Sequence, residues 1–174
     1  MGLRPAKCYK YLEKPYTRQS RRKPKKSYVK GVPYPKITRF EFGKKNKEYS
    51  AELSLVVKHS VQIRSNALEA MRVAANKKLS VGVGEENYFL KVLVFPYHVL
   101  RENAMATGAG ADRYQTGMSL SFGKPIGTAA RVMGNQEILK IYVDKSRIDV
   151  AKEALRIAKS KIPMTSYIKE KIVA

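Results

Sequence analysis

The stretch EYSAELSLVVKHS, residues 48–60, decides the kind of fold that the chain can adopt. Apolar side chains recur in it at every second position, which is typical of a strand with one buried face. The positions are Tyr49, Ala51, Leu53, Leu55 and Val57. We therefore expect a strand of a sheet that is covered on one side.

The next segment, SNALEAMRVAANKKL at residues 65–79, changes to the period of a helix. Leu68, Met71 and Ala75 fall on one helical face, and Asn66 with Glu69 has the spacing of a capping box. Because Gly82 and Gly84 follow, we expect the helix to end before them.

Further along, NYFLKVLVFPYHVL (87–100) favours a central strand that ends near Pro96. Short strands are predicted at MSLSFG (118–123), TAARVM (128–133) and QEILKIYVD (136–144), with a turn at KPIG (124–127). A last helix is predicted from the spacing of Ile148, Ala151, Leu155, Ala158 and Ile162, with Ser146 as its cap and Pro163 as its stop. Strands that do not alternate strictly with two main helices indicate the α+β class, with a mixed or antiparallel sheet.

Charge is the unusual property of the composition. The chain has 174 residues, and its 35 Lys and Arg against 14 Asp and Glu give a net charge of +21. Residues 1–47 hold 16 of the basic residues and 2 of the acidic ones, so this short segment carries +14. Such an excess indicates a polyanionic partner.

The basic segment has the composition of an extended arm. Five prolines interrupt it, and five tyrosines lie among its lysines and arginines: Tyr9, Tyr11, Tyr16, Tyr28 and Tyr34. Basic and aromatic side chains together suit RNA, through phosphate neutralisation and stacking on unpaired bases. The alternative is that the tyrosines only pack on the domain and the charges only keep the chain soluble. We expect an RNA-binding arm over residues 1–46 and one α+β domain over 47–174.

A loop over residues 101–117, within RENAMATGAGADRYQTGM, interrupts the domain. Gly108, Gly110 and Gly117 raise the entropic cost of ordering it, so contacts outside the fold would have to hold it. Small residues permit close approach to RNA, and Arg101, Arg113 and Gln115 can contact phosphates or bases. The alternative is a surface loop without a task, which is uncommon at this length.

Enzyme motifs fail on inspection. GKPIGT at 123–128 has Pro125 where a phosphate loop needs Ser or Thr, and GAGADR at 108–113 has Arg113 at the third glycine position of a dinucleotide fingerprint. His59 and His98 adjoin apolar strands and are interpreted as packing or hydrogen-bonding residues. Cys8 is the only cysteine, so we expect no metal site, no disulfide and a reducing, cytoplasmic setting. No cofactor, small-molecule substrate, membrane span or signal peptide is predicted.

Six segments together carry a resemblance to a known family. They are RPAKCYKYLEKPYTR (4–18), GVPYPKITRFEFG (31–43), IRSNALEAMRVAANK (63–77), YFLKVLVFPYHVLREN (88–103), GAGADRYQTGM (108–118) and FGKPIGTAARV (122–132). In order and spacing the chain resembles the archaeal type of the large-subunit ribosomal protein family called L-sixteen or L-ten-e, from Arg4 to about Val143. The stretch RQSRRKPKKSYVKG (18–31) is richer in Lys and Arg than the family pattern.

The resemblance implies a structural protein of the large ribosomal subunit beside the tRNA sites. Its basic amino-terminal segment would bind large-subunit rRNA, and its central loop would approach the peptidyl transferase centre and the acceptor end of tRNA. Expected partners are large-subunit rRNA, tRNA and other large-subunit proteins, with roles in tRNA positioning and late subunit assembly. The alternative from another class is an RNA-modifying or nucleotide-using enzyme with a basic substrate arm.

Candidate site residues follow from charge and position. The residues expected to contact rRNA are Arg4, Lys7, Arg18, Arg21, Arg22, Lys23, Lys25, Lys26, Lys30, Lys36, Arg39, Arg64, Arg72, Lys124 and Arg131. The residues expected in the tRNA-proximal loop are Arg101, Gly108, Gly110, Arg113 and Gln115. No catalytic residue is predicted.

Overall fold

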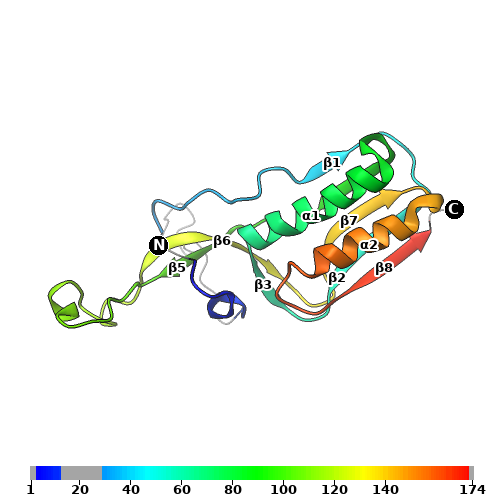
Figure 1. The fold of residues 1–174 in the computed structure, drawn as a ribbon. Helices are drawn as coiled ribbons and strands as arrows, with labels where there is room; N and C mark the ends of the chain where they lie inside the picture. The colour runs from blue at the N-terminus through cyan, green and yellow to red at the C-terminus, as the bar shows by residue number, and fades with distance from the viewer. Residues whose placement is uncertain (1–2, 13–28, 173–174) are drawn as a thin grey trace, which may run out of the picture.

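The main body of the protein is an antiparallel sheet with two helices on one face. In this computed structural model, residues 3–12 and 29–172 are described. The strands of the main sheet lie in the order β1 (Glu41–Gly43), β4 (Tyr88–Val92), β7 (Glu137–Val143), β2 (Ala51–Val57) and β8 (Ser166–Ile172). The helices α1 (Ser65–Val83) and α2 (Ile148–Lys159) lie side by side across it (Figure 1).

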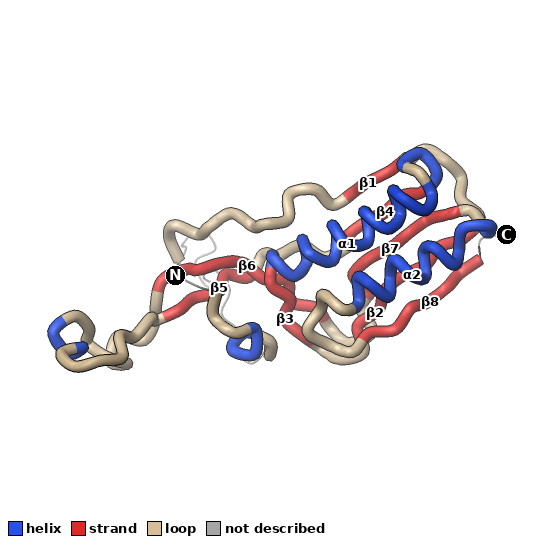
Figure 2. The backbone as a smooth tube through the Cα atoms, in the orientation of Figure 1, coloured by secondary structure: helices blue, strands red, loops and turns tan. Residues whose placement is uncertain are grey.

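A second, smaller sheet leaves the body at one end. Its order is β3 (Val61–Arg64), β6 (Lys124–Val132) and β5 (His98–Glu102), all antiparallel. The β5–β6 hairpin extends away from the helices and carries the central loop at its far end (Figure 2). Its pairing is irregular: Leu100 faces Gly127 and Arg101 faces Pro125, which leaves Ile126 as an extra residue on β6.

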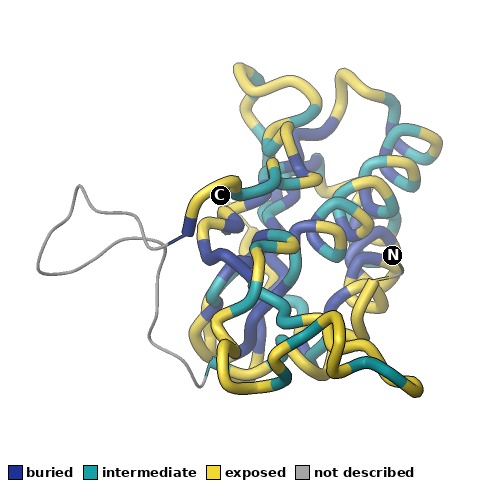
Figure 3. The backbone as a smooth tube through the Cα atoms, turned by 90° about the vertical axis from the view of Figure 1, so that its left-hand side faces the viewer, coloured by how far each residue is buried: buried dark blue, intermediate teal, exposed yellow. Residues whose placement is uncertain are grey.

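The core lies between the helices and the main sheet. Leu53 and Leu55 on β2 are fully buried, as are Met71 on α1 and Leu155 on α2. The tube coloured by burial shows the buried backbone inside an exposed outer layer (Figure 3). The α+β class, the strand at 51–57 and both main helices are therefore confirmed, because their apolar periods match the faces that the core buries.

The opposite face of the main sheet is held by charges instead of helices. Lys140 on β7 forms ion pairs with Glu52 on β2 and with Glu137, and the Glu137 carboxylate accepts a hydrogen bond from Ser54 Oγ at 3.2 Å. The hydrogen bond from Lys140 holds the pKa of Glu137 below its ordinary value, with smaller help from Ser54 and Lys169. The two carboxylates in turn raise the pKa of the Lys140 ammonium.

Two predictions about the ends of α1 are wrong. The N-cap of α1 is Arg64, without a side-chain capping bond, and Glu69 pairs with Arg72 instead of closing a capping box. The helix continues through Gly82, where a Cβ would lie 2.6 Å from Cγ1 of Val150, so this glycine lets the two helices approach. It ends at Gly84, whose φ is +83°.

The end signals of α2 also differ from the predicted ones. Ser146 lies in a 3-10 turn, Lys145–Arg147, and makes no side-chain cap for the helix. The helix ends at Lys159, before Pro163.

Four predictions about strands are corrected by the structure. Residues 118–123 form turns instead of a strand, because they belong to the returning arm of the loop and no strand lies beside them within the described residues. Residues 124–127 form the start of β6 instead of a turn. The segment 87–100 is divided between two sheets: β4 ends at Val92 and β5 begins at His98. The strand β8 at Ser166–Ile172 was missed.

Part of the predicted arm packs with the domain. Ile37 is fully buried in the core, Val29 is 6% exposed, and β1 pairs with β4 through Phe42 opposite Leu90. Residues 3–12 also contact the domain and contain a 3-10 turn, Ala6–Tyr9. Apolar residues in the arm thus have partners far along the chain, which the composition of the arm alone could not reveal.

Candidate nucleic-acid interface

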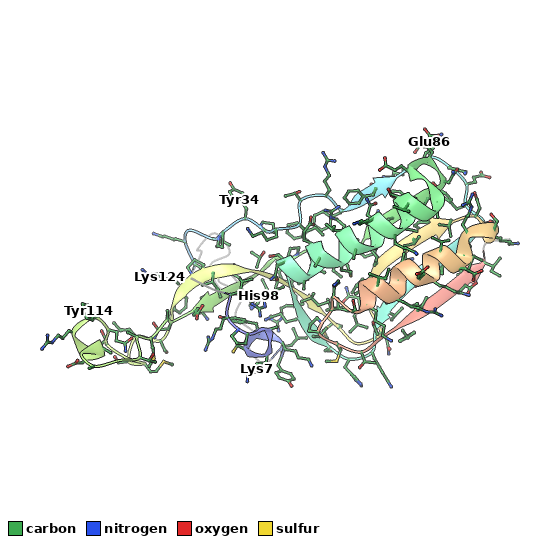
Figure 4. All side chains as sticks on the ribbon, viewed as in Figure 1. Lys7, Tyr34, Glu86, His98, Tyr114 and Lys124 are labelled. Carbon is green, nitrogen blue, oxygen red and sulfur yellow. The ribbon has the colours of Figure 1, made fainter. Side chains whose placement is uncertain are left out.

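The amino-terminal segment, residues 3–12, is fixed on the small sheet through its backbone carbonyl groups. The backbone N–H of Gln62 donates to the Lys10 carbonyl at 2.8 Å, and the Gln62 side chain donates to the Tyr9 carbonyl at 2.9 Å. Arg131 on β6 donates to the Leu12 carbonyl at 3.3 Å. Since the backbone is the part that is bound, the Lys7 side chain of the segment remains exposed (Figure 4).

Tyr9 organises the cations beside this segment. The guanidinium carbons of Arg4 and Arg64 lie 5.8 and 5.5 Å from the centroid of its ring. Its hydroxyl donates to the carbonyl of Arg101 at 3.2 Å, and Arg64 also donates to the carbonyl of Arg4 at 2.8 Å. Two predicted rRNA-binding residues are thus held around one aromatic ring, at the small sheet.

Three further predicted rRNA-binding residues of the arm lie along a second segment. Lys30, Lys36 and Arg39 are exposed on residues 29–40, which run along the outside of the domain toward β1 (Figure 1). The exposed Tyr34 lies in the same segment, and its side chain is 95% exposed. Exposed cations with an exposed aromatic ring are the combination that single-stranded RNA can use.

Arg72 occupies a different environment. Its guanidinium forms an ion pair with Glu69 and lies 4.6 Å from the centroid of the Phe42 ring. A guanidinium engaged in this way supports the packing of β1 against α1. Lys124, by contrast, is exposed at the base of the loop (Figure 4).

Several predicted contacts lie in a part of the chain for which no structure is described. These are Arg18, Arg21, Arg22, Lys23, Lys25 and Lys26, all within residues 13–28.

The central loop has its own internal hydrogen bonds. The side chain of Gln115 donates to the carbonyl of Ala106 at 3.0 Å and accepts from the backbone N–H of the same residue at 2.6 Å. Asn103 donates to the Gly117 carbonyl at 3.2 Å. At the base, the Arg101 guanidinium carbon lies 3.8 Å from the centroid of the Phe122 ring.

The predicted loop residues therefore divide into two groups. Gln115 and Arg101 hold the loop together, whereas Arg113 is exposed near its far end and forms no ion pair with a described residue. Gly110 adopts a φ of +76° at the start of a 3-10 turn, Ala111–Arg113, while a Cβ at Gly108 would meet open space. This loop is held by polar side chains that form hydrogen bonds to its backbone. The sequence has no apolar period here, so these hydrogen bonds could not be predicted from it.

His98 lies buried at the start of the hairpin, 9% exposed. Burial lowers its pKa, and the charges of Arg131 and Arg101 lower it further, so the ring is neutral at pH 7. Its Nδ1 atom has no hydrogen-bond partner among the described residues. His98, interpreted as a packing or hydrogen-bonding residue, is packed in the fold, and its buried Nδ1 atom remains to be paired.

A basic group was missed at the other side of the amino-terminal segment. Lys10, Arg156 and Lys159 line a shallow depression with the chain after α2, residues 160–165. The spacing of Arg156 and Lys159 on the polar face of the last helix is the signal that could have indicated it.

Two further classes of site were searched within residues 3–12 and 29–172. No cluster of three or more His, Cys, Asp or Glu side chains there is arranged to hold a metal ion. In the same part of the chain, no helix has the length and apolar character to cross a membrane.

Comparison with known proteins decides the family. Residues 15–169 match the model of the family described as ribosomal protein L16p/L10e. The chain belongs to the L16p/L10e family. It is 52% identical over 169 residues to the large ribosomal subunit protein uL16 of Staphylothermus marinus, covering 97% of this chain and 93% of that one.

Other archaeal L16p/L10e relatives are similar over the same span. The large ribosomal subunit protein uL16 of Thermofilum pendens is 50% identical over 169 residues, with 97% of this chain and 96% of that one covered. The protein of the same name from Archaeoglobus fulgidus is 45% identical over 168 residues, with 97% and 92% covered. The predicted archaeal type is thereby confirmed.

Membership of the L16p/L10e family also settles the class of function. The chain is a structural protein of the large ribosomal subunit and not an enzyme, and its place is the cytoplasmic ribosome. The alternative of an RNA-modifying enzyme has no support from these relatives.

Proposed function

We propose that the chain binds large-subunit rRNA through the small sheet and the two segments that flank it, and that its loop helps to position tRNA. The observation that carries this proposal is the arrangement of the β5–β6 hairpin. Cations lie between the domain and the loop, at Arg4, Arg64 and Lys124, while the loop extends beyond the domain (Figure 2). Phosphate contacts at the base would hold the register of the protein on RNA, and the tip would remain free for a second partner.

The rRNA contacts that we propose are cations on three parts of the chain. They are Arg4 and Lys7 on the amino-terminal segment, Lys30, Lys36 and Arg39 on residues 29–40, and Arg64, Lys124 and Arg131 on or beside the small sheet. The six predicted contacts within residues 13–28, from Arg18 to Lys26, complete the set by charge alone. Arg72 is left out, because its ion pair with Glu69 gives it a structural role.

For the tRNA step, the proposal rests on Arg113 and on the rigidity that Arg101 gives to the loop base. A guanidinium presents several donors in a fixed plane, which a lysine ammonium cannot copy. We also propose that the completed rRNA contacts support late assembly of the subunit.

The test is reconstitution of large subunits with loop variants. Residues 103–116 are replaced by a short Gly-Ser linker, and separate variants carry Arg101→Lys or Arg113→Lys. We expect a normal yield of subunits and a loss of peptidyl transfer for the linker variant, with a smaller loss for each Arg→Lys change. Arg147→Lys, in the turn before α2 and outside the proposed contacts, is the matched control, and we expect it to behave as the unchanged protein.

Two results would overturn parts of this proposal. Normal peptidyl transfer at normal yield for the linker variant would remove the loop from the tRNA step. A reduced yield with normal transfer per subunit would assign the loop to assembly instead.

A further inference from the structure

A cavity of about 580 Å³ lies between the amino-terminal segment and the base of the β5–β6 hairpin. Its lining includes Arg4, Tyr11, His98, Arg101 and Phe122. We propose that this cavity receives one unpaired nucleotide of the RNA, with its base directed toward His98. The inference rests on the proposed function, since it names the form of RNA that the small sheet recognises.

The first argument is the unpaired atom of His98. The ring is more than nine-tenths buried, and its Nδ1 finds no partner among the described residues. A neutral imidazole offers one N–H donor and one acceptor. Because the pairing edges of nucleobases offer both donors and acceptors, an unpaired base that enters the cavity can satisfy this atom.

The second argument is the chemistry of the walls. Arg4 and Arg101 bring two positive charges, of which Arg4 is partly offset by Glu102 at 3.9 Å. The rings of Tyr11 and Phe122 are 61% and 55% exposed, so both retain surface on which a base can stack. Cations for a phosphate beside rings for a base are the two requirements of a single-stranded nucleic-acid site.

The third argument concerns shape. The volume falls within the range of about 300–1,000 Å³ that is typical of small-ligand sites. One wall is the backbone-bound segment that carries Tyr9, and the other is β5, with His98 at its start (Figure 4). A cavity between two such walls admits a single unpaired nucleotide. A base-paired duplex would remain outside, because its pairing edges are already occupied by the partner strand.

The cavity contains its own chemical reporter. Cys8 is the only cysteine of the chain, it is exposed, and it lies on the lining. The rate at which a neutral reagent such as iodoacetamide alkylates this thiol therefore reports whether the cavity is occupied.

The experiment measures this rate on the full chain with an eight-nucleotide oligouridylate, an oligoadenylate of the same length, or a matched RNA duplex. We expect each single strand to slow alkylation at least five-fold at saturation, and the duplex to slow it less than two-fold. Comparison of the two single strands shows whether the cavity prefers a purine. Equal protection by duplex and single strand would overturn the inference.

Two variants assign the protection to the cavity. His98→Phe keeps a ring of similar size but removes both nitrogen atoms, and Tyr11→Leu removes an exposed ring without altering the core. We expect each variant to lose at least half of the protection, measured against its own rate without RNA. His59→Phe, at an exposed histidine in the turn after β2, is the control and keeps full protection. Full protection in both cavity variants would contradict the inference.

A gel-shift measurement on the same samples separates this inference from the proposed function. If the chain binds RNA while Cys8 is alkylated at its unprotected rate, the cavity is not the site but rRNA binding stands. If the chain binds neither single strands nor large-subunit rRNA fragments, both proposals fail.

Discussion

Gly123 passes so close to Glu102 that a Cβ on the glycine would lie 2.6 Å from the Glu102 carbonyl carbon and carbonyl oxygen. The φ of Gly123 is +73°, a value that L-residues rarely adopt. This contact closes the base of the central loop, so the two strands of the hairpin can meet there only because one residue has no side chain.

The first prediction is that Gly123→Ala destabilises the hairpin by about 1–3 kcal/mol, from backbone strain and the clash with Glu102. We expect faster hydrogen exchange across β5 and the start of β6, measured by mass spectrometry. Gly108→Ala is the matched control, because its Cβ would meet open space. Equal hydrogen exchange in the two variants would show that the close contact between Gly123 and Glu102 does not exclude a side chain at position 123.

The second prediction is that replacement of residues 103–116 by a short Gly-Ser linker changes the free energy of unfolding by less than about 1 kcal/mol. The loop bonds mainly to itself, and loop closure changes by only about 0.6 kcal/mol for each doubling of length. Urea unfolding followed by circular dichroism measures it. Leu139→Ala, at a fully buried position on β7, should cost about 2–5 kcal/mol in the same assay. A loss of similar size in the linker variant would mean that the loop contributes to the core.

The third prediction concerns pH and the charges on the face of the main sheet that lies opposite the helices. The pKa of Glu137 is lowered in the folded protein, chiefly by Lys140, from an ordinary value of 4.5. A lowered pKa stabilises the folded state above 4.5, and this stabilisation is lost as pH falls through the folded value. Lys140→Met should therefore flatten the fall in stability below pH 4.5, measured by urea unfolding from pH 7 to pH 3.

The control for this prediction is Lys78→Met, which breaks the more exposed ion pair between Lys78 and Glu153. Exposed pairs contribute little to stability, so we expect the pH profile of the unchanged protein. If Lys140→Met keeps that profile as well, Lys140 is not what lowers the pKa of Glu137.

The fourth prediction concerns the basic cluster within residues 13–28. Replacement of Arg21, Arg22, Lys23, Lys25 and Lys26 by alanine should flatten the plot of log affinity against log salt for rRNA fragments. Each lost phosphate contact should reduce the slope by about 0.7–0.9. Arg72→Ala serves as the opposite case: we expect a lower melting temperature and an unchanged slope, because Arg72 is paired with Glu69. An unchanged slope after the five replacements would mean that these cations point away from RNA.

The sequence predicted those parts of the fold whose signals lie close together in the chain. The alternation through Leu53 and the helical period through Met71 each come from one buried face, so a short window contains the whole signal. The β8 strand was missed because only its first residue, Ser166, is buried, and its remaining residues alternate weakly along a sheet edge. The strand predicted at 128–133 is part of β6, but residues 124–127 were assigned to a turn, because Pro125 and Gly127 are typical of turns and the partner strand lies over twenty residues earlier.

For the candidate site, charge could be predicted and contacts could not. The composition identified Arg4 and Arg64 as basic residues, but it could not show that Tyr9 lies between them. It suggested that Gln115 would face RNA, whereas the backbone of Ala106 takes up both ends of its amide. The hydrogen-bond partners of polar side chains are set by the fold, and many of these partners are distant in sequence, so a local pattern does not predict them.

The single extra residue on β6, Ile126, has a consequence for where the loop points. An extra residue in one strand of an antiparallel pair bends that strand and increases its twist. The bend lies between the domain and the loop, so the extra residue in β6 sets the direction in which the loop extends. The tip of the loop can therefore change in length or composition without a change in the direction of the hairpin. Removal of Ile126 would instead make the β5–β6 pairing regular and turn the whole loop away from its present direction.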